Sequence, residues 1–595
     1  MLKSYKVFNY YTIFYRYAGW RLPFLILLIL GAGLLELVGI MTLLPLFQVA
    51  LGESLNNPIS EIVATGLNKL GVDASFANLV FLIAAIFIAK GALVFMHSYL
   101  TVRTVTMVRK AVQTSLVTGL ENASYSFFLK QKTGYLSNLL SVETGRFSAS
   151  LRTFAQVFVT SIYILIYLPT IVVFDTEMAL VTIAVGTLAI LLVRPLISRT
   201  KKLSITVSNE AAGLSSQMIE FVQAFPYLKA TANVDKARRH IMRHVNQLVD
   251  LHMRIGIRTA TLSGFKEPIA VTALLGYLFY KVELLGGSLS AVAVVALLLY
   301  RVLGQILELP VSIQRLNQLI GGVHFVADFA QQIENSAEKD GFQSIKNISG
   351  DLVLSNVTFH HGSVPILKDI SMRIEPHKTY GIVGASGSGK TTLFHVLTGL
   401  LNPTSGNISI NGQNYRSLSR RSLRRLFGYV PQEPLIFNDT VANNLSLWGT
   451  GADKINEQNK IKAAADAANC STFIDLFPEG YETLVGERGT RLSGGQRQRI
   501  AIARELYRDP EILIFDEATS ALDSAAESII QKSIEQLHGK RTVIVIAHRL
   551  STIRNCDQIY VMEDGKIAEH GSVTELFNKT DSHFRRMCLE QDITI

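Results

Sequence analysis

Two glycine-rich stretches in the C-terminal half of the chain have the composition of phosphate-binding loops. The first, GASGSGKT at 384–391, has the form G-x-x-x-x-G-K-[ST]. In such a loop the glycines let backbone amides approach phosphate groups, the lysine reaches the terminal phosphates, and the Ser or Thr hydroxyl is a Mg²⁺ ligand. The second, LSGGQRQR at 492–499, places glycines before a helix-favouring run but has no such lysine. It therefore has only part of a phosphate site.

The surroundings of the first loop support a phosphate site. TYGIVG predicts a strand before the loop, and TTLFHVLTGLL predicts a helix after it, which is the context that this motif requires. The residues expected to hold phosphates are Gly384, Ala385, Ser386, Gly387, Ser388, Gly389, Lys390, Thr391 and Thr392.

Three further predicted strands end in polar side chains that could complete this chemistry. ILIFDE ends in Asp516 and Glu517, and two acids after a buried strand are unusual unless a cation is near. Asp516 is expected to bind Mg²⁺ together with Thr391 and Gln432, and Glu517 to polarise the attacking water. Gln432 ends GYVPQ and His548 ends TVIVIAH, at strand tips where ligands bind in parallel sheets. Alone, a histidine at a strand end is more often structural, and the glutamine signal is weak.

The elements around these motifs alternate short β-branched strands with helices from Asp351 onward. This order predicts an α/β domain with a largely parallel sheet over 351–590. The polar, glycine-punctuated stretch 329–350 predicts a linker. All three cysteines, Cys470, Cys556 and Cys588, follow it without metal-site spacing, which favours a reducing compartment.

The N-terminal half has the composition of a membrane domain. The chain of 595 residues is 49% hydrophobic and 17% charged, which is too apolar for a typical cytosolic protein. Spanning a bilayer takes about 20 apolar residues. Six segments of that kind lie near 22–48, 78–100, 153–174, 178–195, 268–287 and 290–309. They predict an all-α polytopic membrane domain over 21–328.

Charge outside the spans predicts the orientation. Basic residues concentrate in 101–152 and 194–266, so these long loops are expected to face the cytoplasm, together with the N-terminus and everything after 310. The net charge of +10 is mostly this topology signal, and we expect no nucleic-acid partner. Residues 1–20 mix aromatic and basic side chains, which is typical of a helix in the headgroup layer; a basic flank that only sets topology explains them equally well.

Charged residues inside predicted spans allow two interpretations. Glu36, Lys90 and Arg301 fall within their segments, where unpaired charges are costly. They either have a structural role, as an ion pair of Glu36 with Lys90 or Arg301 or as side chains that snorkel to the interface, or they line a cationic cavity for a substrate with an anionic group. We expect the second role for Arg301 especially.

Taken together, the motifs resemble those of an ATP-binding cassette transporter of the exporter type. GASGSGKT, YVPQ, LSGGQ, ILIFDE, SALD and IAHR occur in order across about 380–550. Six spans before one nucleotide-binding domain match a half-transporter, so the resemblance covers nearly the whole chain. It implies ATP and Mg²⁺ as ligands, Glu517, His548 and Gln432 as catalytic residues, and Asp523 as the D-loop aspartate. It also implies a signature stretch formed by Leu492, Ser493, Gly494, Gly495 and Gln496.

The resemblance further implies that two chains pair head to tail, each phosphate loop facing the signature of the other copy. A homodimer would have two competent sites, and a heterodimer stays open. One departure concerns the base: the family usually has an aromatic residue about 25 positions before the phosphate loop, and His361 stands there, with Phe359 two residues earlier. Either ring could stack on adenine.

The substrate is the least defined part of the resemblance. ELVGIMTLLPL, TGYLSNLL and Arg301 are loosely similar to bacterial flippases for lipid-linked oligosaccharides. This implies ATP-driven export or flipping of an amphipathic, anionic substrate across a bacterial inner membrane, with the nucleotide-binding domain in the cytoplasm. Lipid A or phospholipid flipping, peptide or drug export, and an ATP-gated channel or regulator are the alternatives.

Overall fold

The computed structural model describes residues 7–52, 58–69, 71–284, 289–449, 454–518, 524–547 and 550–590. The chain divides into two compact units, Met1–Ala337 and Glu338–Ile595. The first is entirely helical in its described residues, and the second contains the sheets. The predicted order, a helical membrane domain followed by an α/β domain, is confirmed.

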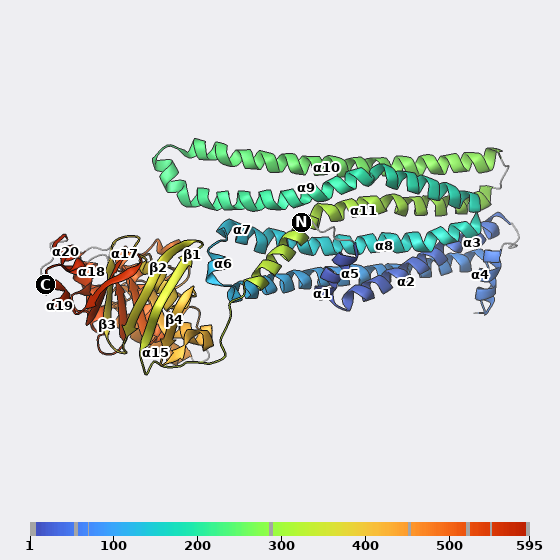
Figure 1. The fold of residues 1–595 in the computed structure, drawn as a ribbon. Coiled ribbons are helices and arrows are strands. Elements are labelled where there is room, and N and C mark those ends of the chain that lie inside the picture. Colours follow the sequence, from blue (N-terminus) through green and yellow to red (C-terminus); the bar gives the residue numbers. More distant parts are fainter. Residues whose placement is uncertain are drawn as a thin grey trace. The chain divides into compact units, whose positions relative to one another are not determined.

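Long helices that run side by side make up the first unit (Figure 1). All the described α-helices of this unit, long and short, are α1 (Val7–Ala18), α2 (Arg21–Met41), α3 (Leu43–Leu51), α4 (Pro58–Lys69), α5 (Phe76–Asn122), α6 (Tyr125–Phe128), α7 (Thr133–Asn138), α8 (Thr144–Phe174), α9 (Thr176–Ala230), α10 (Val234–Phe279) and α11 (Leu289–Asn335). Two π-helical turns, Leu139–Glu143 and Tyr280–Leu284, precede α8 and follow α10.

Within the described residues, five helical stretches are long and apolar enough to cross a membrane. They are Arg21–Leu51, Phe76–Asn122, Thr133–Val172, Thr176–Ala230 and Val295–Asn335. The remaining predicted span, 268–287, lies on α10 and the π-helical turn after it, and it ends among undescribed residues. Lys281 and Glu283 lie within the described part of this span and lower its mean hydropathy, and Glu267 directly precedes it. These charges explain why this stretch is not among the five.

The basic segments expected to be long loops are instead largely helical. α9 has 55 residues, which at about 1.5 Å per residue gives roughly 80 Å, more than twice the thickness of a bilayer core. Helices α5 and α10 are extended in the same way. The close hairpin predicted between spans three and four is a single residue, Asp175, whose carboxylate accepts the Met178 N–H at 3.1 Å and caps α9.

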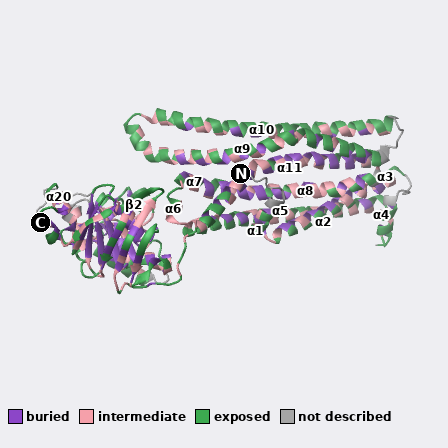
Figure 2. Ribbon diagram, in the orientation of Figure 1, coloured by how far each residue is buried: buried purple, intermediate pink, exposed green. Residues whose placement is uncertain are grey.

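Helix α11 is the best buried of the long helices, and it packs against α8, α9 and α10 (Figure 2). Helix α1 also joins this core, since Phe14 is fully buried between Phe147 and Phe154 of α8. Its Tyr15 side chain is exposed. One face of the predicted interfacial helix is therefore a packing face, and an exposed aromatic residue remains for the headgroup layer.

The second unit consists of two sheets and the helices around them. Its strands are β1 (Leu352–His361), β2 (Val364–Ile374), β3 (Thr379–Gly384), β4 (Ser405–Ile410), β5 (Gln413–Asn414), β6 (Phe427–Val430), β7 (Ile512–Asp516), β8 (Thr542–Ile546), β9 (Gln558–Glu563) and β10 (Lys566–Gly571). Its helices are α12 (Lys390–Leu397), α13 (Arg420–Arg425), α14 (Val441–Ser446), α15 (Lys454–Ala467), α16 (Ser471–Ile474), α17 (Gly494–Arg508), α18 (Ser524–Glu535), α19 (Val573–Asn578) and α20 (His583–Glu590).

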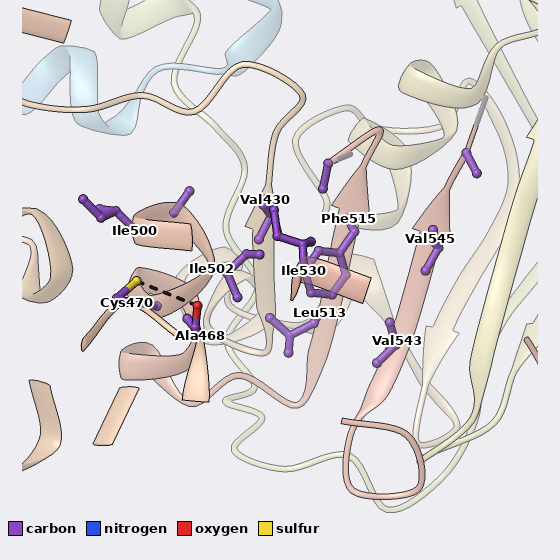
Figure 3. Packing of buried hydrophobic residues seen from close by; sticks show 14 of the residues in the cluster. Val430, Ala468, Cys470, Ile500, Ile502, Leu513, Phe515, Ile530, Val543 and Val545 are labelled. Atoms are coloured by element: carbon purple, nitrogen blue, oxygen red, sulfur yellow. Dashed lines mark hydrogen bonds between the residues drawn. The ribbon is translucent and has the colours of Figure 1, made fainter. Parts of the chain in front are cut away.

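The larger sheet has the order β10-β9-β3-β8-β7-β6, and all its pairs are parallel except β9 with β10. The smaller, antiparallel sheet has the order β2-β1-β4-β5. Val430, Leu513, Phe515, Val543 and Val545 of β6, β7 and β8 join residues of α17 and α18 in one apolar core (Figure 3). This core fixes the carboxyl ends of the parallel strands, where the predicted site residues lie.

The predicted linker 329–350 is not one uniform segment. Residues up to Asn335 belong to α11, and the chain from Glu338 onward is part of the second unit. The polar composition of this stretch reflects an exposed helix end followed by a segment that is hydrogen-bonded to α13.

Candidate active site

The phosphate loop has the conformation that its glycines predict. β3 is buried along its whole length and ends at Gly384, and α12 begins at Lys390. Gly387 and Gly389 have φ of 83° and 101°, the left-handed region that glycine adopts without strain. The Lys390 side chain folds over the loop, and its Nζ donates to the carbonyl oxygens of Gly384 at 2.9 Å and Ala385 at 3.0 Å.

Two groups inside this loop are suited to an anion. Burial lowers the pKa of the Lys390 ammonium, although the carboxylates of Glu517 and Asp516 act in the opposite direction. The Ser388 hydroxyl is buried and has no hydrogen-bond partner among the described residues. A buried cation near its own carbonyls and an unpaired hydroxyl are both stabilised by a bound phosphate.

The strand ends bring the predicted acids to this loop. Asp516 is the last residue of β7 and lies opposite Ile546 of β8, next to β3. Glu517 follows with φ of 49°, a strained conformation for a residue other than glycine, and its N–H donates to the Ile546 carbonyl at 2.9 Å. Gln432 Nε2 donates to Glu517 Oε2 at 2.8 Å. The hydrogen bond from its N–H fixes the Glu517 backbone, and the hydrogen bond from Gln432 holds its carboxylate.

Asp516 has a supporting residue that the sequence did not reveal. The Tyr429 hydroxyl donates to Asp516 Oδ2 at 3.1 Å, and its ring stacks on Phe394 of α12 with centroids 4.1 Å apart. Burial raises the pKa of Asp516, and the Tyr429 hydrogen bond offsets this only in part. The available signal was the position of Tyr429 in GYVPQ, on the strand beside β7. A buried carboxylate with a raised pKa is a site that a cation would stabilise.

The predicted base-stacking residues lie on the hairpin beside the loop. His361 ends β1 opposite Val364, and Phe359 lies opposite Leu367. This hairpin contacts the phosphate loop at Gly389. A Cβ added to Gly389 would lie 3.1 Å from Leu367 Cδ2 and 3.3 Å from the Ile366 carbonyl oxygen. His361 is exposed and Phe359 is half-buried. Both rings therefore belong to a hairpin that contacts the phosphate loop, and the His361 ring is open to a ligand.

The signature stretch starts helix α17. Ser493 Oγ accepts the Gln496 N–H at 3.2 Å, and the Ser493 N–H donates to Gln496 Oε1 at 2.8 Å, forming a capping box. Leu492 and Gly495 are buried, whereas Ser493 and Gly494 are exposed. The exposed N-terminus of a helix of 15 residues can attract an anion from outside the chain. Asp523 and His548 lie outside the described residues.

The mid-span charges form one cluster in the first unit. Glu36 Oε2 lies 3.0 Å from Lys90 Nζ, and Glu36 Oε1 lies 3.4 Å from Arg301 Nη1. The carboxylate is buried, but the Arg301 side chain is 46% exposed. The internal pairing and the exposed cation, weighed as alternatives from the sequence, therefore occur together.

Arg301 also lines a cavity of about 570 Å³ between α8, α10 and α11. Cations outnumber carboxylates in its wall, with Lys266, Arg301 and Arg315 against Glu267 and Glu308. Glu308 Oε2 is 2.6 Å from Lys266 Nζ, and its Oε1 is 3.2 Å from Arg315 Nη1. Glu308 alone pairs with both Lys266 and Arg315. With Arg301 and Glu267 included, the cavity wall has one more cation than carboxylates, and this excess positive charge favours an anionic ligand.

Comparison with known proteins identifies the family. Residues 22–306 match the ABC transporter transmembrane region, and residues 367–520 match the ABC transporter family itself. The heterocyst differentiation ATP-binding protein HepA of Nostoc sp. is 32% identical over 457 residues, 76% of this chain and 74% of the relative. The chain belongs to the ABC transporter family. An ABC transporter of this kind binds ATP, hydrolyses it and couples the hydrolysis to transport.

Two relatives and one solved structure refine the picture of this ABC transporter. ATP-dependent lipid A-core flippases of Desulfotalea psychrophila and Syntrophus aciditrophicus are 31% and 29% identical, covering 83% and 91% of this chain and 86% and 91% of theirs. A bacterial Atm1-family ABC exporter with ATP bound has a TM-score of 0.79 over 96% of this chain and 99% of its own, at 24% identity. The fold is that of an integral membrane ABC exporter.

Proposed function

We propose that this ABC exporter uses ATP to flip an amphipathic lipid with an anionic headgroup across a bacterial inner membrane. A lipid-linked oligosaccharide or another glycolipid is the favoured class. The half-exposed Arg301 guanidinium in a cavity with excess positive charge carries this proposal. The cavity volume lies within the range typical of ligand sites. The lipid A-core flippases among the relatives support a lipid substrate.

In the proposed ATP site each side chain has a distinct task. Lys390 leaves its two loop carbonyls to bind the terminal phosphates, and the amides from Gly384 to Thr392 surround them. Glu517, held by Gln432, orients the attacking water and accepts its proton. We assign the base to His361 or Phe359.

The donor set at the strand ends fits Mg²⁺. The Thr391 hydroxyl, the Gln432 amide and the Asp516 carboxylate are oxygen donors of the kind Mg²⁺ prefers, and the buried Asp516 lacks a cation that balances its charge fully. Bound Mg²⁺ would neutralise charge on the phosphates.

We further propose that two copies of the chain form the working transporter, with the nucleotide-binding domain and the N-terminus in the cytoplasm. In this dimer the exposed Ser493 and Gly494 of one copy contact the phosphate that Lys390 of the other copy holds. Asp523 and His548 have the family's D-loop and switch positions. A bilayer surrounds the exposed apolar faces of α5 and α9.

The test uses purified protein in proteoliposomes with a panel of lipid A, a polyprenyl-diphosphate oligosaccharide, phosphatidylethanolamine and an apolar peptide. We expect the two anionic glycolipids to stimulate ATP hydrolysis and to be flipped. Arg301→Ala should raise the lipid concentration needed for half-maximal stimulation roughly 10-fold to 100-fold, the effect of losing one charged hydrogen bond. Arg254→Ala is the control, since this arginine lies on α10, away from the cavity lining, and pairs with Asp250.

Three outcomes would contradict the proposal. Stimulation by the peptide alone would indicate a peptide exporter. An ATP-dependent ion current without flipping would indicate a channel. An unchanged response of Arg301→Ala to the glycolipids would remove Arg301 from substrate binding.

A further inference from the structure

The segment that follows α11 is fastened to the short basic helix α13. We call residues 338–345 the strap. Its backbone pairs with the chain just before α13: the Gly341 N–H donates to the Leu418 carbonyl at 3.2 Å, and the Gln343 N–H donates to the Ser417 carbonyl at 3.0 Å. A Cβ on Gly341 would overlap the Ser417 carbonyl, so the strap lies as close as the backbone allows.

Two acidic side chains of the strap hold α13 at its opposite ends. Asp340 Oδ1 accepts the Arg420 N–H at the start of the helix, where a negative charge is favourable. Glu338 pairs with Arg424 in the last turn, and the side chains are only 12% and 33% exposed. This partly buried pair is less screened by solvent than an exposed surface pair.

Arg424 has a second partner that connects it to the phosphate loop. Its Nη2 also donates to the Gly399 carbonyl at 3.0 Å. Gly399 lies two residues after the end of α12, and its N–H donates to the Val396 carbonyl of that helix at 3.1 Å. One guanidinium therefore joins the strap to the carboxyl end of the helix that begins at Lys390. That helix has eight residues, about 12 Å, so a shift at one end moves the other.

Helix α13 also leads directly to Gln432. Only Leu426 separates it from β6, which ends at Val430, two residues before Gln432. The Leu426 carbonyl accepts the Ile512 N–H at 2.9 Å, at the start of the strand that carries Asp516. A displacement of α13 therefore reaches both strands that end in the active site.

We propose that Arg424 is a positioning residue through which the strap sets the geometry of the ATP site. The strap continues the chain of α11, so movement of this membrane helix reaches Lys390 through α12 and Gln432 through β6. The connection runs within one chain and requires only that this ABC transporter hydrolyses ATP; it is independent of the substrate.

The experiment measures two quantities in full-length protein in nanodiscs. One is the KM for ATP. The other is the rate at which maleimide labels Ser263→Cys, a position that lines the membrane cavity, compared with and without ADP and vanadate. The three native cysteines are buried, so their background labelling is low. The ratio of the two rates reports how strongly the ATP site controls the membrane domain.

We expect Arg424→Ala to raise the KM for ATP about tenfold and to bring the labelling ratio close to one. Glu338→Ala should reduce the ratio in the same way, and Arg424→Lys, whose ammonium can still donate to Glu338 and to the Gly399 carbonyl, should keep part of it. Arg425→Ala is the matched control, because this arginine is exposed on the same helix. It should change neither quantity.

Gly341→Val gives an independent test if Arg424→Ala does not fold. This substitution displaces the strap but leaves the hydrogen bond from Arg424 to the Gly399 carbonyl. The labelling ratio should therefore fall, while the KM for ATP stays within about twofold of the parent value. The proposal is overturned if Arg424→Ala keeps both the KM and the ratio of the parent. It is also overturned if Arg425→Ala has effects as large, or if Arg424→Lys lowers the labelling ratio as far as Arg424→Ala does.

Discussion

Removing the charge of Glu36 tests how the mid-span cluster is held together. Glu36→Gln keeps the shape of the side chain and leaves Lys90 and Arg301 without their carboxylate. Lys90 is the closer partner at 3.0 Å and is only 19% exposed, so most of the effect should come from it. Losing one partner of a buried pair costs about 3–5 kcal/mol. Arg301 is 46% exposed and adds at most about 1 kcal/mol. We therefore expect the free energy of unfolding to fall by about 3–5 kcal/mol.

The assay is chemical denaturation in mixed micelles. A second variant tests whether the loss comes from the unpaired charge of Lys90. Glu36→Gln combined with Lys90→Met should recover most of the loss, because an apolar pair can replace a buried ion pair at little cost. Glu308→Gln is the control and should have a smaller effect, since Glu308 is 20% exposed against 6% for Glu36 and its partners Lys266 and Arg315 are 34% and 51% exposed. A loss below about 1 kcal/mol for Glu36→Gln, or no recovery in the double variant, would refute this reasoning.

Three further predictions concern the ATP site. Glu517→Gln should lower kcat for ATP hydrolysis by about 10²-fold to 10⁴-fold and leave binding of a fluorescent ATP analogue intact, and a loss below tenfold would remove Glu517 from the role of general base. His361→Ala should weaken ATP binding in titration calorimetry, whereas His361→Tyr should not; equal affinities would assign the base to Phe359 or another residue. Burial raises the pKa of Asp516, so its carboxylate takes up a proton at a higher pH than an ordinary aspartate. Mg²⁺ affinity, measured without nucleotide, should therefore begin to fall at a higher pH than at a site built on an ordinary aspartate, and a loss of affinity that begins only below about pH 4 would contradict the assignment.

Motifs with a fixed backbone geometry were predictable from the sequence. Gly387 and Gly389 require the left-handed conformation that the loop has. The strand that ends in Asp516 lies next to the strand that ends in Ile546, whose carbonyl accepts the Glu517 N–H. These features depend on local chemistry and on the rule that parallel strands end at one edge.

Features that depend on distant contacts could not be predicted in this way. The support of Asp516 by Tyr429 requires the register of two strands. Pairing of Glu36 was one interpretation of the sequence, but that its carboxylate serves both Lys90 and Arg301 depends on the packing of three helices. The strap has the polar composition of a free linker, but Gly341 and Glu338 fasten it to residues about eighty positions away. The basic segments 101–152 and 194–266 were expected to be loops because their charge predicts orientation but says nothing about helix length.

The central claim is that two copies build each ATP site, one supplying Lys390 and the other Ser493. Lys390→Ala and Ser493→Arg should each abolish ATP hydrolysis as separate preparations. When the two variants are co-expressed with different tags and the mixed dimer is isolated, one of its two sites has an intact loop and an intact signature. We predict that the mixed dimer regains ATP hydrolysis. A mixed dimer as inactive as its parents would contradict the account.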